Sequence, residues 1–176
     1  LGLMKLDTIT KTKLTTKPIS ISFNQLSEKD IDTVFLIESQ SSKHPWTKNQ
    51  LLESINNPVN LGYALIYKSE IIGFLLAMPS IESADILNIV INSNYQRKGF
   101  GRALIERLIE ALLKRGVSEI LLEVRVSNVS AIEFYLSLGF KEISVRKNYY
   151  TKNSNELLVK EDGIIMRLEI STFINT

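Results

Sequence analysis

Cysteine is absent from the 176 residues, histidine occurs once, and no long apolar run is present. Without cysteine the chain has no disulfide, no thiolate metal ligand and no cysteine nucleophile, which suits a reducing compartment. The single histidine, His44, does not make a metal site, so we expect no metal. No run approaches the ~18–20 apolar residues that cross a bilayer, and the first residues lack the apolar centre of a secretory signal. We therefore expect a cytoplasmic protein with no membrane partner.

An excess of charge of one sign is also missing. The net charge is +2, but residues 1–18 carry four lysines against one aspartate, which leaves the rest of the chain at −1. A nearly neutral domain lacks the broad basic face of a general nucleic-acid binder, so we expect no nucleic-acid partner. Residues 1–18 show no periodicity and are interpreted as a flexible tail, with a transit segment as the alternative. The length fits one domain, which we place at residues 19–170, followed by a C-terminal tail at 171–176.

Apolar residues recur with periods of 2 and 3.6, which predicts the element order β-α-α-β-β-β-α-β-α-β-β. Capping signatures at Ser27 and Thr47 mark the first two helices, while Gly116 and Gly139 end the last two. The expected strands are residues 19–23, 61–68, 71–78, 84–91, 120–126, 141–147 and 164–168, and residues 152–163 are expected to form a polar loop. Hairpin strands come first and helix crossovers later, so we expect an α/β (α+β) fold with a mixed sheet of about seven strands.

Two glycines and three cations gather where a predicted strand turns into the long third helix. Glycine lets the backbone approach a ligand, and the free N–H groups of a helix start attract anions. The dinucleotide fingerprint is excluded because Leu104 stands where it needs a third glycine, and the Walker loop is excluded because Gly-Lys-Ser/Thr is absent. The pattern Gln-x-x-Gly-x-Gly, from Gln96 to Gly101, remains. It indicates either an anion site or an ordinary basic turn.

Polar residues with two possible meanings follow in the next strand and helix. Glu123 interrupts an apolar strand, where a carboxylate is costly unless it has a function or pairs with a cation such as Arg125. Asn128 fits a helix N-cap as well as a ligand contact. Tyr135 lies on the apolar side of its helix, so it is either a packed tyrosine or a buried proton donor. From the residues alone, these alternatives stay open.

Together these segments resemble the GCN5-related N-acetyltransferase (GNAT) family. The resemblance rests on the Gln-x-x-Gly-x-Gly turn, the Leu-Glu-Val-Arg strand, the Ser-Asn helix start and the Phe-Tyr-x-x-x-Gly-Phe segment, and it covers about residues 19–170. It is strongest to the bacterial ribosomal protein alanine N-acetyltransferases, through His44-Pro45-Trp46 and the segments 146–150 and 162–166. The resemblance implies the GNAT fold, with helices on both faces of the sheet and a V-shaped splay between two parallel strands.

The resemblance also implies a cofactor and a mechanism. Acetyl-CoA would lie in the splay, Glu123 would be the general base, and Tyr135 would be the general acid. The implied cofactor contacts are Ile89, Val90, Ile91, Arg97, Lys98, Gly99, Phe100, Gly101, Arg102 and Asn128. The implied reaction is direct attack of an amine on the thioester, with no covalent acyl-enzyme.

The implied substrate is the N-terminal alanine of a protein of the small ribosomal subunit. Tyr149 and Tyr150 are expected in a flap over the peptide, or else packed at a strand end, and Trp46 is expected in the opposite wall. The polar segment 151–161 is longer than usual connections and is a candidate for altering the substrate. The alternatives are acetylation of lysine side chains, polyamines or other small amines, and a non-catalytic acyl-CoA sensor. We expect a monomer or a weak dimer.

Overall fold

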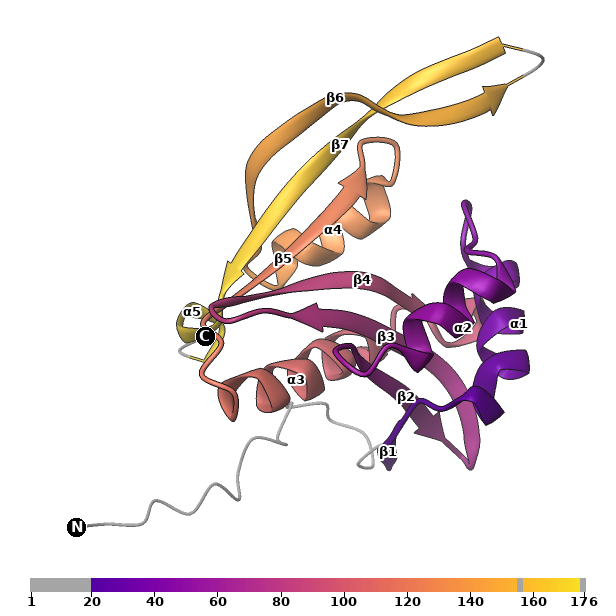
Figure 1. The fold of residues 1–176 in the computed structure, drawn as a ribbon, viewed down its shortest axis with the longest axis vertical. Helices are drawn as coiled ribbons and strands as arrows, with labels where there is room; N and C mark the ends of the chain where they lie inside the picture. Colours follow the sequence, from indigo (N-terminus) through magenta and orange to yellow (C-terminus); the bar gives the residue numbers. More distant parts are fainter. Residues whose placement is uncertain (1–19, 155–156, 175–176) are drawn as a thin grey trace.

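The computed structural model describes residues 20–154 and 157–174, which contain one mixed sheet with helices on both of its faces (Figure 1). The strands lie in the order β1-β2-β3-β4-β5-β7-β6. Their bounds are β1 (Ile21–Gln25), β2 (Leu61–Tyr67), β3 (Glu70–Pro79), β4 (Ser83–Ile91), β5 (Glu119–Arg125), β6 (Lys141–Ser154) and β7 (Leu157–Glu169). All neighbours are antiparallel except β4 and β5, which confirms the predicted mixed sheet.

The helical elements are η1 (Glu28–Asp30), α1 (Ile31–Ser41), α2 (Lys48–Asn56), η2 (Ser93–Tyr95), α3 (Phe100–Leu113), α4 (Val129–Ser137) and α5 (Ile170–Ile174). The two predicted capping residues each start a helical segment: Ser27 is the N-cap of η1, which leads into α1, and Thr47 is the N-cap of α2. Thr47 Oγ1 accepts a hydrogen bond from the Gln50 N–H at 3.2 Å, and Gln50 Oε1 accepts one from the Thr47 N–H at 2.8 Å. None of the helices described is long and apolar enough to cross a membrane.

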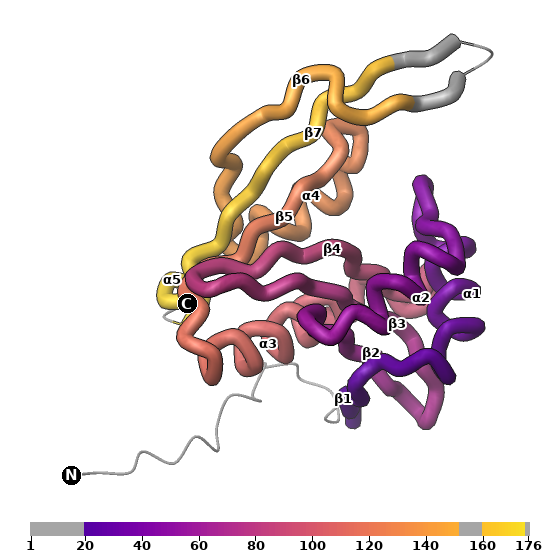
Figure 2. Tube along the Cα trace, viewed as in Figure 1, coloured from indigo at the N-terminus to yellow at the C-terminus, as the bar shows by residue number. Residues whose placement is uncertain are grey.

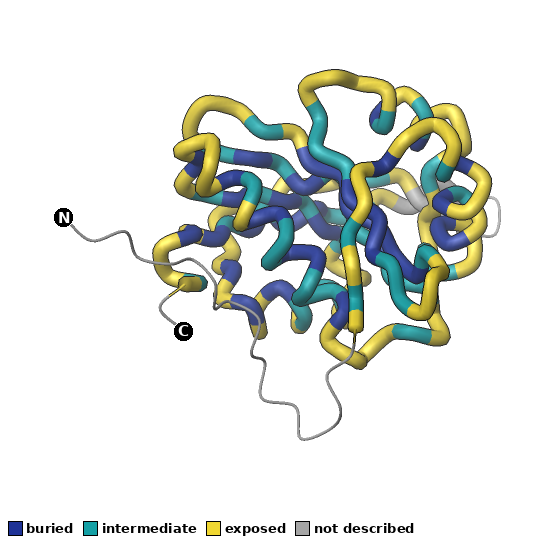
Figure 3. The backbone as a smooth tube through the Cα atoms, turned by 90° about the horizontal axis from the view of Figure 1, so that it is seen from below, coloured by how far each residue is buried: buried dark blue, intermediate teal, exposed yellow. Residues whose placement is uncertain are grey.

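The two faces of the sheet bury separate apolar clusters. On one face α1 and α2 cover residues such as Phe74 and Leu76; on the other, α3 and α4 cover residues such as Leu75 and Leu122. Figure 3 shows these buried segments inside an exposed outer shell. Burial of each leucine contributes about 1.5–3 kcal/mol, so both helix layers are firmly held. We call the first face the α1/α2 face and the second the α3/α4 face.

The sheet splits in its middle. The parallel pairing of β4 with β5 covers only Ser83–Ile86 against Glu119–Leu122, and the two strands then diverge (Figure 1). Beyond Ile86, β4 pairs with β3 alone, while β5 continues to pair with β7. This divergence is the V-shaped splay that the resemblance implied.

The C-terminal segment corrects one prediction. The expected polar loop at residues 152–163 is wrong, because β6 and β7 continue through most of it as a long hairpin that projects from the rest of the chain (Figure 2). Residues 147–149 form a bulge opposite Asp162, whose carboxylate accepts from the Asn148 N–H at 2.8 Å and pairs with Lys147 at 3.2 Å. Strand pairing resumes at Tyr150 and Glu161, so polar residues that look like loop residues instead hold an irregular ladder.

The ends of the chain also bear on the predictions. Ile170, the last residue of the predicted domain, is 1% exposed and begins the short helix α5, which continues into the predicted C-terminal tail at 171–176. The N-terminal tail predicted at residues 1–18 lies outside the described residues.

Candidate active site

The splay leaves one edge of β4 without a strand partner. Residues Leu87–Ile91 no longer pair with β5, and a register shift opposite Leu76 and Ala77 bends β4 at this point. Backbone amides without strand partners remain available to an extended ligand, which they bind as a further strand would. Ile89, Val90 and Ile91, the predicted backbone contacts for the cofactor, lie along this edge.

The glycine turn follows directly from β4. Gly99 adopts φ +85°, a left-handed conformation that glycine reaches without steric cost, and it is the N-cap residue of α3. The Gln96 side chain donates to the Ile91 carbonyl at 2.9 Å and closes the turn. The first N–H groups of α3 have no partner inside the helix. The turn therefore presents N–H donors and the positive end of α3 at one end of the open β4 edge.

The three cations of this turn differ in their contacts. Arg102 is 2.9 Å from Glu106 and stacks over the Phe173 ring at 5.0 Å. Lys98 donates to the Asn94 carbonyl at 2.9 Å, a neutral acceptor. Neither Arg97 nor Lys98 has an ion pair within residues 20–154 and 157–174. The positive charge left for an anion thus comes from Arg97 and Lys98, whereas that of Arg102 is largely compensated.

Helix α4 lies against the glycine turn. A Cβ added to Gly101 would be 3.0 Å from the Phe134 ring, so glycine lets α4 approach this closely. The next residue, Tyr135, is 8% exposed and stacks on Phe140 with ring centroids 5.4 Å apart. Burial raises the pKa of Tyr135. The phenol is consequently protonated at neutral pH, as a proton donor must be.

Glu123 lies on β5 just where this strand leaves β4. Its carboxylate is 3.1 Å from the Arg146 guanidinium, and it accepts a hydrogen bond from the Tyr150 hydroxyl. Burial raises the pKa of Tyr150 and the bond to Glu123 acts in the same direction, so the phenol is the donor. Gly163 leaves room for this pair, since a Cβ there would be 3.2 Å from Glu123 and 3.1 Å from Tyr150. Glu123 thus forms an ion pair, which is one of the two explanations considered for it, and Arg146 is its partner.

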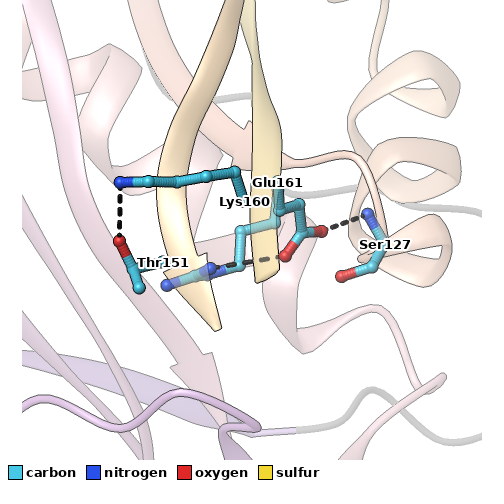
Figure 4. Close-up of polar contacts among 5 residues, drawn as sticks. Ser127, Thr151, Lys160 and Glu161 are labelled. Atoms are coloured by element: carbon cyan, nitrogen blue, oxygen red, sulfur yellow. Dashed lines mark hydrogen bonds and ion pairs between the residues drawn. The ribbon is translucent and has the colours of Figure 1, made fainter. Parts of the chain in front are cut away.

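A second set of contacts, made by Arg125 and Glu161, supports the ring of Tyr150. The Arg125 guanidinium stacks 3.9 Å from the Tyr150 ring centroid and lies 3.3 Å from Glu161. Glu161 also accepts from the Ser127 N–H at 2.8 Å (Figure 4), and hydrogen bonds from Ser127 hold its pKa below the ordinary value. In the same hairpin, Lys160 donates to Thr151 at 3.1 Å. Tyr150 is therefore held by Glu123 and Arg125 of β5, and Glu161 of β7 holds Arg125 in turn.

Glu123 and Tyr135 belong to opposite faces of β5. Leu122 and Val124 are buried in the same cluster as Tyr135, on the α3/α4 face. Side chains alternate along a strand, so Glu123 points to the α1/α2 face. The splay is the place where a ligand passing between β4 and β5 is accessible from both faces. A base and an acid on opposite faces suit a reaction in which the nucleophile enters from one side and the leaving group departs on the other.

The remaining predicted site residues, Asn128, Tyr149 and Trp46, lie in three different environments. Asn128 is the N-cap of α4, with its Oδ1 accepting from the Ala131 N–H at 3.4 Å, so one of its possible meanings is realised. Tyr149 is 52% exposed, with Arg146 over its ring at 4.9 Å. Trp46 is on the α1/α2 face, where it lines a cavity of about 320 Å³ together with Leu87. Within the described residues, no group of three or more potential metal ligands occurs.

Three residues of this region were not predicted. Glu38 of α1 is 1% exposed and accepts from the Trp46 N–H at 2.8 Å and from Asn88 Nδ2 at 3.2 Å. Asp85, on the α1/α2 face of β4, has its pKa raised by burial. A signal for Glu38 was present, since it continues the apolar spacing of Ile31 and Val34 along one side of the helix. No sequence pattern pointed to Asn88 or Asp85, because their surroundings depend on where β4 and β5 separate.

Comparison with known proteins agrees with this geometry. Residues 27–140 match the model of the acetyltransferase (GNAT) family. The chain belongs to this family.

Among individual proteins, the chain is similar to the [ribosomal protein bS18]-alanine N-acetyltransferase of Escherichia coli strain K12. The two are 37% identical over 150 residues, which is 85% of this chain and 98% of the relative. The same-named enzyme of Haemophilus influenzae is 36% identical over 143 residues, with 81% and 94% covered. The crystal structure of the ribosomal-protein-S18-alanine N-acetyltransferase from Escherichia coli superposes with a TM-score of 0.76 at 35% identity, covering 86% of this chain and 94% of that one.

Proposed function

We propose that this chain transfers an acetyl group from acetyl-CoA to the N-terminal amine of a protein, most specifically the N-terminal alanine of ribosomal protein bS18. The observation that carries the proposal is the pair of groups on opposite faces of the splay, Glu123 and Tyr135, beside an open strand edge and a glycine turn. The names of the relatives support the substrate, and the family supports acetyl-CoA.

The cofactor site follows from the backbone. The N–H groups of the turn at Gly99 and the charges of Arg97 and Lys98 would take the pyrophosphate of acetyl-CoA. The open edge at Ile89–Ile91 would hydrogen-bond the amide groups of the pantetheine arm and place the thioester at the splay. An N–H group of β4 near Val90 would stabilise the oxyanion of the tetrahedral intermediate. Asn128, at the start of α4, would contact the arm from the other side.

The amine enters from the α1/α2 face. An N-terminal amine has a pKa of about 7.7–8.0, against about 10.4 for lysine, so a single carboxylate suffices to deprotonate it near neutral pH. Glu123, oriented by Arg146 and Tyr150, would accept this proton directly or through a water. Tyr135 would give its proton to the departing CoA thiolate on the α3/α4 face. The peptide that follows the amine would lie between the hairpin, with Tyr149 and Tyr150, and Trp46.

A panel of three acceptors tests this proposal. The purified chain is mixed with acetyl-CoA and an alanine-led peptide, an internal-lysine peptide with a blocked N-terminus, or spermidine, and acetyl incorporation is followed by mass spectrometry. We expect acetylation of the alanine-led peptide at its N-terminus. Preference for lysine or spermidine would assign the alternative amine substrates, and binding of acetyl-CoA without transfer to any acceptor would assign a sensor.

The cofactor assignment has a separate test. Calorimetric titration of acetyl-CoA into the wild type and into the Arg97→Ala/Lys98→Ala variant measures the contribution of these two cations to acetyl-CoA affinity. We expect about tenfold weaker binding in the variant at low salt and a smaller difference at high salt, because salt screens exposed charges. Equal affinities at low salt would remove Arg97 and Lys98 from the cofactor site.

A further inference from the structure

One buried carboxylate has no place in the chemistry described so far. Glu38, near the end of α1, is 1% exposed, and no cation pairs with it in the part of the chain that the structure describes. Its acceptors are satisfied by neutral donors: the Trp46 N–H at 2.8 Å, Asn88 Nδ2 at 3.2 Å and the Ser42 side chain. Burying a charge without a counter-ion is costly, so a glutamate at this position is expected to have a function that offsets its cost to stability.

The donors come from two separate parts of the active site. Trp46 lies in the connection between α1 and α2, directly before the α2 N-cap Thr47, on the face from which the amine would enter. Asn88 lies on β4 beyond Ile86, where that strand has left β5, and directly precedes the open edge at Ile89–Ile91. Glu38 is therefore a bridge: one carboxylate connects the wall of the amine site to the strand that would carry the thioester.

We propose that Glu38 and Asn88 form a positioning pair that fixes Trp46 relative to the split edge of β4 and so sets the approach of the amine to the thioester. The proposal rests on the proposed function, since it concerns the same site. A displacement of a bound group by about 1 Å costs as much as 100-fold in rate, which makes the spacing between wall and strand matter. Neither residue touches the reacting atoms.

The chemistry of the pair explains why a carboxylate is needed. A carboxylate is only an acceptor, and its two oxygens serve several donors at once. In Glu38→Gln one oxygen becomes an NH₂ group, and Asn88 keeps its contact only by turning its amide over so that Oδ1 accepts from the new NH₂ group. In Asn88→Asp two carboxylates face each other. In the double variant Glu38→Gln/Asn88→Asp the pattern is complementary again, because the new amide donates to the new carboxylate and its oxygen accepts from Trp46.

The experiment is a double-variant cycle with two readouts. Trp46 is the only tryptophan in the chain, so its fluorescence and its quenching by acrylamide report the position of this wall without any substrate. Steady-state kinetics with the alanine-led peptide give kcat and KM for the peptide, and titration gives the affinity for acetyl-CoA alone. We expect Asn88→Asp to change Trp46 quenching and to lower kcat/KM for the peptide by about 10- to 100-fold. Glu38→Gln, which a turned Asn88 amide accommodates, should give a smaller change in both readouts. Acetyl-CoA affinity should change less than threefold.

The double variant should recover most of kcat/KM and the wild-type quenching. Asn88→Ala removes one donor and leaves the carboxylate in place, so it should lower kcat/KM by a smaller factor. It replaces a single variant that does not fold. Asp32→Asn is the matched control: it breaks an exposed ion pair to Lys48 that also joins α1 to α2, and it should leave both readouts unchanged.

Two results would overturn the proposal. Wild-type kcat/KM and wild-type quenching in Asn88→Asp would remove the pair from positioning. A loss in Asn88→Asp that the double variant does not recover would reduce Glu38 to a fold-stabilising residue. Failure of the proposed function is separable, since a wild type that does not acetylate the peptide still reports the position of Trp46 through quenching.

Discussion

The two faces of the split sheet hold their candidate catalytic groups by different means. On the α3/α4 face Tyr135 packs among apolar and aromatic side chains, and helix α4 is placed by the contact of Phe134 with Gly101. On the α1/α2 face Glu123 is held by Arg146 and Tyr150, which a second set of charged residues supports in turn. The contrast shows that packing alone holds a buried phenol, whereas a less buried carboxylate is held by partners that fix its charge.

The largest effect should come from Glu123→Gln on the α1/α2 face. Without the carboxylate only the free amine reacts, so we expect kcat to fall by about 10²- to 10⁴-fold, with the greatest deficit at low pH where the amine is protonated. The measurement is kcat against pH with the alanine-led peptide. Glu119→Gln is the matched control, because Glu119 lies on the same strand, pairs with Arg167 and is away from the splay. A wild-type rate for Glu123→Gln would end the role of Glu123 as base.

On the α3/α4 face the corresponding change is Tyr135→Phe. The ring keeps its packing, so stability should change little, while loss of the proton donor should slow release of the CoA thiol by about 10²-fold. Thiol release is followed with a disulfide reagent under saturating substrate. Tyr63→Phe gives the comparison, since Tyr63 is equally buried, at 8% exposure, in the same cluster. If both variants release thiol at the wild-type rate, Tyr135 is a packing residue only.

A smaller effect is expected where the hairpin meets the base. Tyr150→Phe removes the hydrogen bond to Glu123 and leaves Arg146 in place, so we expect a loss of about tenfold in kcat/KM for the peptide, which is the scale of one hydrogen bond to a charged group. Tyr149→Phe is the control, because that ring is 52% exposed and does not contact Glu123 in any described hydrogen bond or ion pair. Equal effects of the two changes would show that the hairpin tyrosines act only as a surface for the peptide.

The smallest effect is expected from a substitution in the glycine turn, which belongs to neither face of the sheet. Gly99→Ala forces a side chain into φ +85° at a cost of about 1–2 kcal/mol, and we expect both a lower melting temperature and weaker acetyl-CoA binding. Gly116→Ala carries a similar cost at φ +74° but lies beyond the far end of α3. Thermal melting and acetyl-CoA titration of the two variants should therefore agree in stability and differ in affinity. Equal affinities would indicate that the turn does not hold the cofactor.

The sequence predicted most of the α3/α4 face and less of the other. The turn at Gly99, the helix that follows it and the position of Tyr135 all depend on neighbours in the chain, which local patterns report. The partners of Glu123 are about 20 to 40 residues away, so no local pattern identifies Arg146 or Gly163 as its neighbours. The same limit explains the wrong loop at residues 152–163, where a bulge held by Asp162 hides the alternation of a strand.

The short parallel ladder between β4 and β5 has a consequence for how the protein responds to its cofactor. Only four residue pairs join β4 to β5, which makes this the shortest ladder in the described sheet. A molecule that bridges both strands would act as a missing eighth strand and would raise the unfolding temperature with its concentration. The lifetime of such a protein in a cell would then follow the supply of acetyl donor, in addition to its rate of turnover.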